Sequence, residues 1–191
     1  MKIVYIHGAS ATPDSFNYIR EHINYPNEVI IEYKSDNGFE NNLEIMVAKL
    51  KKEKDKFFFI AHSLGGIYSL HLANYFPKKT LGAVTISTPY GGSREADYAK
   101  YFLPFSRLMR DIGPHSKPVT KTNKLDVLHP WCNIVTTSGE SPWILEPNDG
   151  VVTIDSMRHR TDMEFVELPH NHYEIVICAD TVKVIQDRLP K

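Results

Sequence analysis

Cysteine is scarce in this sequence of 191 residues, which contains only Cys132 and Cys178. Each lies in an apolar run, no C-x-x-C spacing is present, and the pair could form at most one disulfide. Free cysteine behaves as a small apolar side chain, so we expect both residues to be buried free thiols. A fold held together by several disulfides is excluded.

Long apolar runs are also missing. No stretch approaches the roughly 20 apolar residues that a membrane-spanning helix needs. Residues 1–7, which precede the first glycine, are too few for the apolar region of a signal peptide. We therefore expect a cytoplasmic protein with no integral membrane segment. The composition, 42% hydrophobic and 24% charged, is ordinary for a globular protein, and the length predicts a single domain over residues 1–191.

Neither sign of charge dominates, because 22 lysines and arginines face 23 acidic residues and the net charge is −1. This balance gives no bulk attraction to nucleic acid or to anionic membranes, so we expect no nucleic-acid partner. Metal-site signatures are lacking too. His170 and His172 stand two residues apart, but no cysteine or acidic cluster accompanies them at ligand spacing. We expect no metal and no cofactor.

The most informative stretch that is present is FFFIAHSLGGI, residues 57–67. Four apolar residues able to form a buried strand lead into a small-x-Ser-x-Gly turn, and apolar residues then recur at helical spacing. Strand, sharp turn and helix are the setting of a nucleophilic serine, and small residues at Ala61 and Gly65 would let the turn close against its neighbours. Ser63 is therefore the candidate nucleophile. The alternative is a plain loop in which Ser63 caps the next helix.

Alternating strands and helices predict the fold. We expect strands at residues 2–7, 27–33, 57–60, 81–87, 131–137 and 163–168. We expect helices at residues 13–23, with Thr12 as the N-cap, and at 41–52, 67–76 and 176–189. Short strands that alternate with helices favour a three-layer α/β/α fold around a mostly parallel six-stranded sheet, in which ligands bind outside the carboxyl ends of the strands.

An acyl-transfer site needs two backbone N–H donors for the oxyanion, one after the nucleophile and one from a neighbouring loop. We assign these donors to Leu64 and Ala9. Gly8 would let the loop after the first strand fold tightly enough to aim the Ala9 N–H. The alternative for this loop is an ordinary turn.

A serine nucleophile also needs a base and a carboxylate that orients the base. Asp149, in the loop after the fifth predicted strand, is the best candidate for the acid, although Asp-Gly is also a common turn signal. The base is expected just before the last helix, where His170 and His172 compete. We prefer His172, and His170 would then be a surface or supporting group.

Residues 94–130 interrupt the alternation of strands and helices. Aromatic and aliphatic residues recur there every three or four positions across Pro104, until Gly113 and Pro114 end the pattern. This predicts a proline-interrupted helical insertion, which either covers the site as a cap or lid or packs as ordinary core. A lid would imply an apolar substrate.

Several of these motifs resemble the lipase-like branch of the α/β-hydrolase superfamily. They are His7-Gly8, the 61–65 turn, STPYGGS at 87–93, NDGVV at 148–152 and His172. The resemblance covers nearly the whole chain, with Ser, Asp and His in the order of that fold. It implies a minimal α/β-hydrolase fold of six parallel strands. Ala61 departs from the usual Gly-x-Ser-x-Gly, a substitution also found in the compact branch.

The resemblance implies a serine esterase that acts on small-molecule or lipid esters through Ser63, Asp149 and His172. Within enzymes, the alternative is a thioesterase or an acyltransferase with the same three residues. From another class, the alternative is a binding protein on the hydrolase scaffold. The substrate itself does not follow from the fold, because this fold hosts many reactions.

Overall fold

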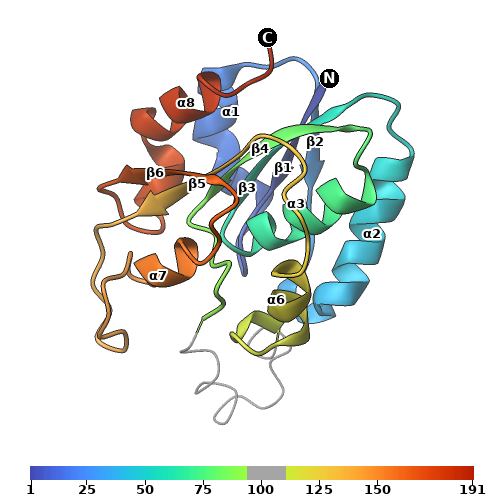
Figure 1. Cartoon of the computed structure of the whole chain (residues 1–191). Helices are drawn as coiled ribbons and strands as arrows, with labels where there is room; N and C mark the ends of the chain where they lie inside the picture. The colour runs from blue at the N-terminus through green and yellow to red at the C-terminus, as the bar shows by residue number, and fades with distance from the viewer. Residues whose placement is uncertain (94–110) are drawn as a thin grey trace.

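Six strands form one parallel sheet in the computed structural model, which describes residues 1–93 and 111–191. The strands are β1 (Lys2–Ile6), β2 (Glu28–Ile31), β3 (Phe57–His62), β4 (Thr80–Ile86), β5 (Trp131–Thr136) and β6 (Glu164–Leu168). Their order across the sheet is β2-β1-β3-β4-β5-β6, and every neighbouring pair is parallel. The prediction of a six-stranded α/β sheet is confirmed (Figure 1).

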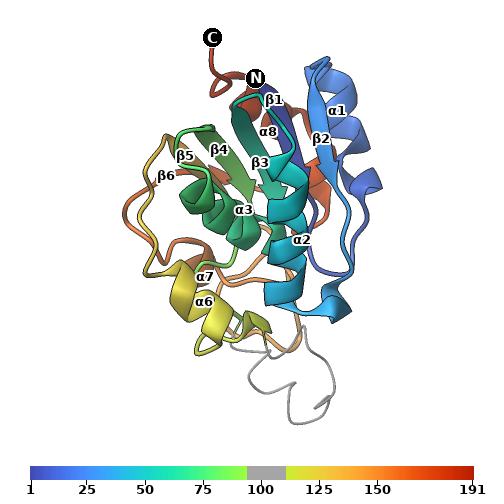
Figure 2. The same cartoon turned by 90° about the vertical axis from the view of Figure 1, so that its right-hand side faces the viewer.

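Helices cover both faces of the sheet, which gives three layers (Figures 1 and 2). On one face lie α1 (Asn17–Ile23) and α8 (Ala179–Gln186), and on the other lie α2 (Phe39–Lys51) and α3 (Leu64–Tyr75). Two short helices, α6 (Lys117–Thr122) and α7 (Ile154–Met157), contact α3 and β5, respectively. Short 3₁₀ turns occupy Pro13–Phe16, Ser35–Asn37 and Glu174–Ile177.

The central strand β3 explains the run of aromatic residues in the sequence. Phe57 and Phe59 pack with α2 and α3, whereas Phe58 and Ile60 pack with α1 and α8. Every residue of β3 is buried. A parallel strand covered on both faces must be apolar at successive positions, because no position faces water. The end of β3 is therefore held rigidly, and this is where the candidate nucleophile follows.

One helix prediction is wrong in its extent. The predicted helix at 176–189 is split, because the chain is extended at Cys178 (φ −115°, ψ 149°) between a 3₁₀ turn and α8. The helix predicted at 13–23 spans those residues with Thr12 in the N-cap position, but its first turn is 3₁₀ and the Thr12 side chain makes no capping hydrogen bond. Both cysteines are free and Cys132 is buried, as expected, but Cys178 at the extended junction is partly exposed.

The predicted insertion at 94–130 lies partly outside the described residues, which omit 94–110. In the described remainder, α6 is tied to the body of the protein. His71 Nε2 of α3 lies 2.9 Å from Thr122 Oγ1. The Arg160 guanidinium donates to the carbonyls of Thr122 and Leu125 at 2.8 and 2.6 Å. The end of this segment is thus anchored beside α3.

Candidate active site

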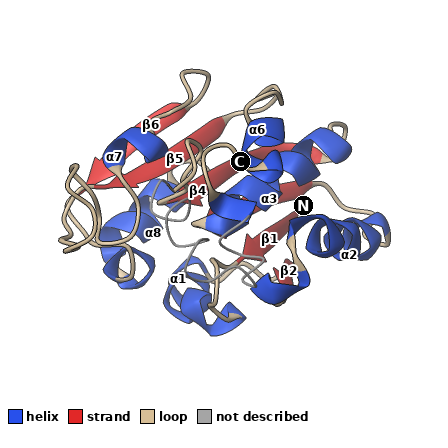
Figure 3. Ribbon diagram, turned by 90° about the horizontal axis from the view of Figure 1, so that it is seen from below, coloured by secondary structure: helices blue, strands red, loops and turns tan. Residues whose placement is uncertain are grey.

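The candidate residues gather where the strands end. Because the six strands run parallel, their carboxyl ends meet at one edge of the sheet, the lower edge in Figure 1, which Figure 3 views from below. Ser63 follows β3 directly, Asp149 lies in the loop after β5, and His172 lies in the loop after β6. Segments far apart in the sequence therefore meet at the edge where open α/β sheets bind their ligands.

Ser63 occupies a sharp turn between β3 and α3. Its backbone angles are φ 50° and ψ −122°, outside the regions that non-glycine residues ordinarily adopt. Two hydrogen bonds hold the turn: the Ser63 N–H donates to the Ile86 carbonyl at 2.8 Å, and the Gly66 N–H donates to the Ser63 carbonyl at 2.9 Å. Backbone strain of this kind costs roughly 1–3 kcal/mol and concentrates at functional sites. A strained strand-to-helix turn is the backbone form of a nucleophile elbow.

Two glycines explain how this turn closes against its neighbours. A Cβ atom at Gly65 would lie 2.1 Å from the Ile6 carbonyl oxygen, and one at Gly66 would lie 1.9 Å from Thr88 Oγ1. Neither position has room for a side chain, so α3 begins in direct contact with the end of β1 and the loop after β4. Ala61, the departure from the usual glycine, is fully buried in β3.

The loop after β1 lies against Ser63, since a Cβ atom at Gly8 would be 3.2 Å from Ser63 Cβ. His7 holds this loop. The Tyr33 N–H donates to His7 Nε2 at 3.4 Å, so Nδ1 carries the proton and donates to the Gly8 carbonyl at 2.8 Å. Burial lowers the pKa of His7 and favours this neutral ring. In a trans peptide the Gly8 carbonyl and the Ala9 N–H point in opposite directions, so His7 also sets the direction of the Ala9 N–H.

The N–H groups of Ala9 and Leu64 are the predicted oxyanion donors. Within the described residues, neither group donates a hydrogen bond to another atom of the protein. Leu64 is the first residue of α3, and N–H groups in the first turn of a helix have no partner inside the helix. As far as the described residues go, both N–H groups are therefore free to bind a ligand oxygen.

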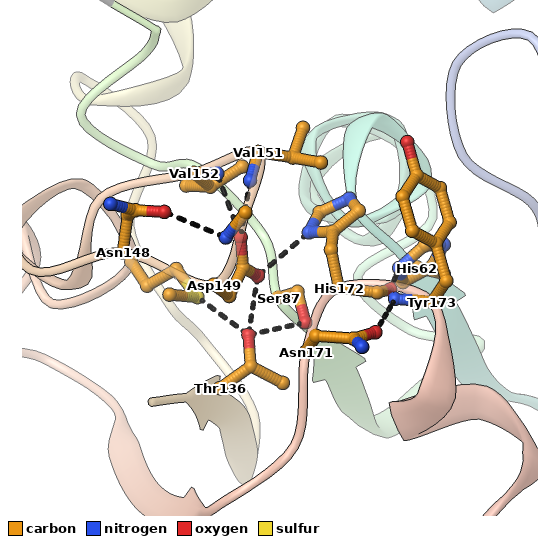
Figure 4. A network of polar contacts seen from close by, with 12 residues as sticks. His62, Ser87, Thr136, Asn148, Asp149, Val151, Val152, Asn171, His172 and Tyr173 are labelled. Atoms are coloured by element: carbon orange, nitrogen blue, oxygen red, sulfur yellow. Dashed lines mark hydrogen bonds and ion pairs between the residues drawn. The ribbon is translucent and has the colours of Figure 1, made fainter. Parts of the chain in front are cut away.

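Asp149 is fully buried, and its carboxylate accepts four hydrogen bonds (Figure 4). Oδ1 accepts from the N–H groups of Val151 and Val152 at 3.0 and 2.7 Å. Oδ2 accepts from the Thr136 hydroxyl and from His172 Nδ1. Burial raises the pKa of the Asp149 carboxyl, but the hydrogen bond and electrostatic interaction with His172, followed by the hydrogen bonds from Thr136 and Val152, outweigh burial and hold the pKa below its usual value. The carboxylate is therefore charged at neutral pH.

His172 is the histidine that meets this carboxylate. Its Nδ1 lies 2.7 Å from Asp149 Oδ2, and its backbone N–H donates to the Asp149 carbonyl at 2.9 Å. Because a carboxylate only accepts, Nδ1 carries the proton and Nε2 keeps a lone pair. His170 instead lies 3.4 Å from Asp180 at a partly exposed position. Of the two histidines considered, His172 has the arrangement that a general base requires.

The Ser63 hydroxyl and His172 Nε2 form no hydrogen bond in the part of the chain that the structure describes. The residue before Ser63 nevertheless contacts the loop of His172: the ring centroids of His62 and His172 are 4.7 Å apart. Hydrogen bonds between nucleophile and base are often long in free enzymes and tighten in the substrate complex. The two side chains thus come from segments that touch each other.

The sequence does not single out two hydroxyl residues that lie behind Asp149. Thr136, the last residue of β5, donates its proton to Asp149 Oδ2. Ser87 Oγ lies 2.9 Å from Thr136 Oγ1 and must be the donor in that pair, because the Thr136 proton is already used. Ser87 directly follows β4 with φ 52°. A hydroxyl residue at the end of each of two neighbouring strands is the signal that could have identified them.

Replacing Thr136 with valine should destabilise the protein, since it removes a hydrogen bond to a buried charge. Such bonds contribute about 1.5–3 kcal/mol, so we expect the free energy of unfolding at pH 7 to fall by about 2 kcal/mol. An aspartate with a lowered pKa stabilises the fold above its ordinary pKa, and this stability is lost as the pH falls through the folded value. Loss of the Thr136 hydrogen bond raises the pKa of Asp149 in the folded state, so acid unfolding should begin at a higher pH.

Urea unfolding at pH 7 and an acid titration followed by circular dichroism would measure both effects. Thr137→Val is the matched control, because within residues 1–93 and 111–191 the Thr137 hydroxyl makes only a 3.4 Å contact with the Leu168 carbonyl. Equal losses of stability in the two variants would contradict the role assigned to the Thr136 hydroxyl.

No group of three or more histidine, cysteine, aspartate or glutamate side chains within residues 1–93 and 111–191 is arranged to hold a metal ion. In the same part of the chain, no helix is long and apolar enough to cross a membrane.

Known proteins share this fold. No protein-family model matches the sequence, and no curated protein matches it. Among solved structures, the mature lipase BlEst2 of Bacillus licheniformis superposes with a TM-score of 0.81 at 16% identity, over 100% of this chain and 92% of that one. A lipase-esterase related protein from Clostridium acetobutylicum gives a TM-score of 0.70 at 12% identity, over 97% and 93% of the two chains.

A pyrethroid hydrolase from Sphingobium faniae is also similar, with a TM-score of 0.63 at 14% identity over 98% of this chain and 96% of that one. Identities this low establish a common fold alone. The chemistry must be argued from the side chains at the carboxyl edge of the sheet.

Proposed function

We propose that this chain, which has the α/β-hydrolase fold, is a serine hydrolase that cleaves carboxylic esters through Ser63, His172 and Asp149. The observation that carries the proposal is the buried pair of His172 Nδ1 and Asp149 Oδ2, which lie 2.7 Å apart. His172 also contacts His62, the residue immediately before the strained turn at Ser63. An acidic partner for the imidazole, beside a serine in this backbone form, is the arrangement that nucleophilic acyl transfer requires.

In the first half of the reaction, Ser63 Oγ attacks the ester carbonyl carbon while His172 Nε2 takes the hydroxyl proton. The N–H groups of Ala9 and Leu64 bind the oxyanion that forms. The tetrahedral intermediate then collapses, the bond to the alcohol oxygen breaks, and His172 returns the proton to the leaving alkoxide. The alcohol departs and an acyl group remains on Ser63.

In the second half, His172 takes a proton from water, and the hydroxide attacks the acyl carbon. Collapse of the second intermediate releases the carboxylic acid, and the proton on His172 returns to Ser63 Oγ. Asp149 accepts from Nδ1–H throughout, which keeps Nε2 as the proton acceptor and stabilises the imidazolium. These steps use only side chains and N–H groups of this chain, so the proposal includes no metal and no cofactor.

Hydrolysis of a series of p-nitrophenyl esters from acetate to decanoate tests the proposal and reports the preferred acyl length. A fluorophosphonate probe should also form a covalent adduct, which mass spectrometry should place on the peptide that contains Ser63. A preference for thioesters, or ester formation with an added alcohol, would redirect the proposal to a thioesterase or an acyltransferase. A folded protein that neither hydrolyses any ester nor reacts with the probe would contradict it and favour a binding protein.

A further inference from the structure

His62, the last residue of β3, is 5% exposed and lies against the loop that carries the base. Its Nε2 is 3.0 Å from the His172 carbonyl oxygen. Since a carbonyl only accepts, Nε2 carries the proton and donates, which leaves a lone pair on Nδ1 of the neutral ring. Burial, followed by the nearby His172, lowers the pKa of His62 to about 3, so the ring is neutral at physiological pH.

The other side of the His62 ring faces the loop that carries the predicted oxyanion donor. A Cβ atom at Gly8 would lie 3.0 Å from His62 Nδ1. Nδ1 is buried and has no hydrogen-bond partner among the described residues, so this edge of the ring makes packing contacts only. The ring thus lies between the loop after β1 and the loop of His172, and Figure 4 shows it beside His172.

The hydrogen bond of His62 constrains the position of the His172 backbone relative to β3, which the contacts with Asp149 do not constrain. Asp149 holds the His172 ring and its backbone N–H from the loop after β5, which sets how the imidazole is turned. The His62 hydrogen bond instead joins the His172 backbone to β3, immediately before Ser63. It spans 110 positions of the sequence. A reacting pair displaced by about 1 Å can lose roughly a hundredfold in rate, so this link bears directly on catalysis.

We propose that His62 is a positioning residue for ester hydrolysis, whose Nε2–H hydrogen bond to the His172 carbonyl holds the base at working distance from the Ser63 hydroxyl. This role rests on the proposed function. It differs from the roles of Ser63, His172 and Asp149, because His62 acts through the backbone of His172 and exchanges no proton with the substrate.

His62→Gln and His62→Met test the proposal as a pair. Both side chains are flexible and similar in length, but only the glutamine can place an N–H donor near the position of Nε2. We expect His62→Met to lower kcat by roughly 10- to 100-fold with KM nearly unchanged. His62→Gln should recover most of that loss. The asparagine side chain of His62→Asn carries an N–H donor but is too short to bring it to the His172 carbonyl. This variant should therefore behave as the methionine variant does, and it separates the effect of donor position from the effect of side-chain polarity.

Hydrogen exchange supplies a measurement that does not depend on activity. The His172 N–H, which donates to the Asp149 carbonyl, should exchange faster in His62→Met and His62→Asn than in the wild type, with β1 and β3 unaffected. A kcat within about twofold of wild type in both donor-deficient variants would overturn the inference. So would equal losses in all three variants, or exchange at His172 that does not change. A wild-type protein with no esterase activity would instead refute the proposed function, while the exchange result would still report whether His62 restrains the loop.

Discussion

The Ser63→Ala variant is expected to lower kcat for p-nitrophenyl ester hydrolysis by roughly 10⁴- to 10⁶-fold. Alanine has no hydroxyl, so no acyl group can be transferred to the protein at this position. His172 then has no serine hydroxyl from which to take a proton. The N–H groups of Ala9 and Leu64 would remain, and binding with oxyanion stabilisation alone leaves only weak residual catalysis. Steady-state release of p-nitrophenolate measures the loss, and the fluorophosphonate adduct should disappear with it.

Ser63→Gly is the control that separates loss of the nucleophile from damage to the turn. Ser63 has φ 50°, so alanine keeps the backbone strain whereas glycine relieves it. We expect the glycine variant to be more stable than the alanine variant by about 1 kcal/mol and to be equally inactive. Activity in either purified variant above about a tenth of the wild-type value would show that Ser63 is not the nucleophile.

The Asp149→Asn variant should lower kcat by about 10⁴-fold. Each carboxylate oxygen of Asp149 accepts two hydrogen bonds. The NH₂ group of the asparagine would therefore face hydrogen-bond donors whichever oxygen it replaced. If it faces His172, the imidazole is driven to the tautomer with the proton on Nε2, and this nitrogen can no longer accept the proton of Ser63. If it faces the N–H groups of Val151 and Val152, the loop itself is disturbed.

The loss should appear in kcat rather than in KM, because Asp149 is buried and does not contact the substrate in the proposed mechanism. Asp155→Asn, at an exposed position in the first turn of α7, changes the net charge by the same amount and should keep wild-type activity. Urea unfolding of both variants at pH 7 would separate loss of fold from loss of function. If Asp149→Asn kept its fold and its full kcat, Asp149 could not be the acid of the site.

Local sequence determined much of the fold. The strand, turn and helix around Ser63 are adjacent in the chain, so their pattern could be read without knowledge of distant contacts. The apolar run of β3 is required because both faces of that strand are buried. The predicted α/β-hydrolase fold with six parallel strands is confirmed by the sheet and by its similarity to the solved structures of a lipase, a lipase-esterase related protein and a pyrethroid hydrolase.

The ends of helices were less well determined. Apolar residues continue at helical spacing from Val176 to Leu189, which predicted one helix, yet the backbone is extended at Cys178. Hydrophobic periodicity records which side chains face the core, and residues on both sides of Cys178 do so. It does not record whether the backbone between them is helical.

Local patterns in the sequence identified the kinds of side chain at the candidate site and their order: a serine in a sharp turn, an aspartate after a late strand and two histidines before the last helix. The packing of the strands was needed to show that His172, rather than His170, meets Asp149. It also decided that Thr136 lies behind the carboxylate and that His62 contacts the loop of His172. These contacts join residues between 13 and 110 positions apart. Distances of that kind depend on how the strands pack side by side, whereas a local sequence pattern reports only on residues a few positions apart.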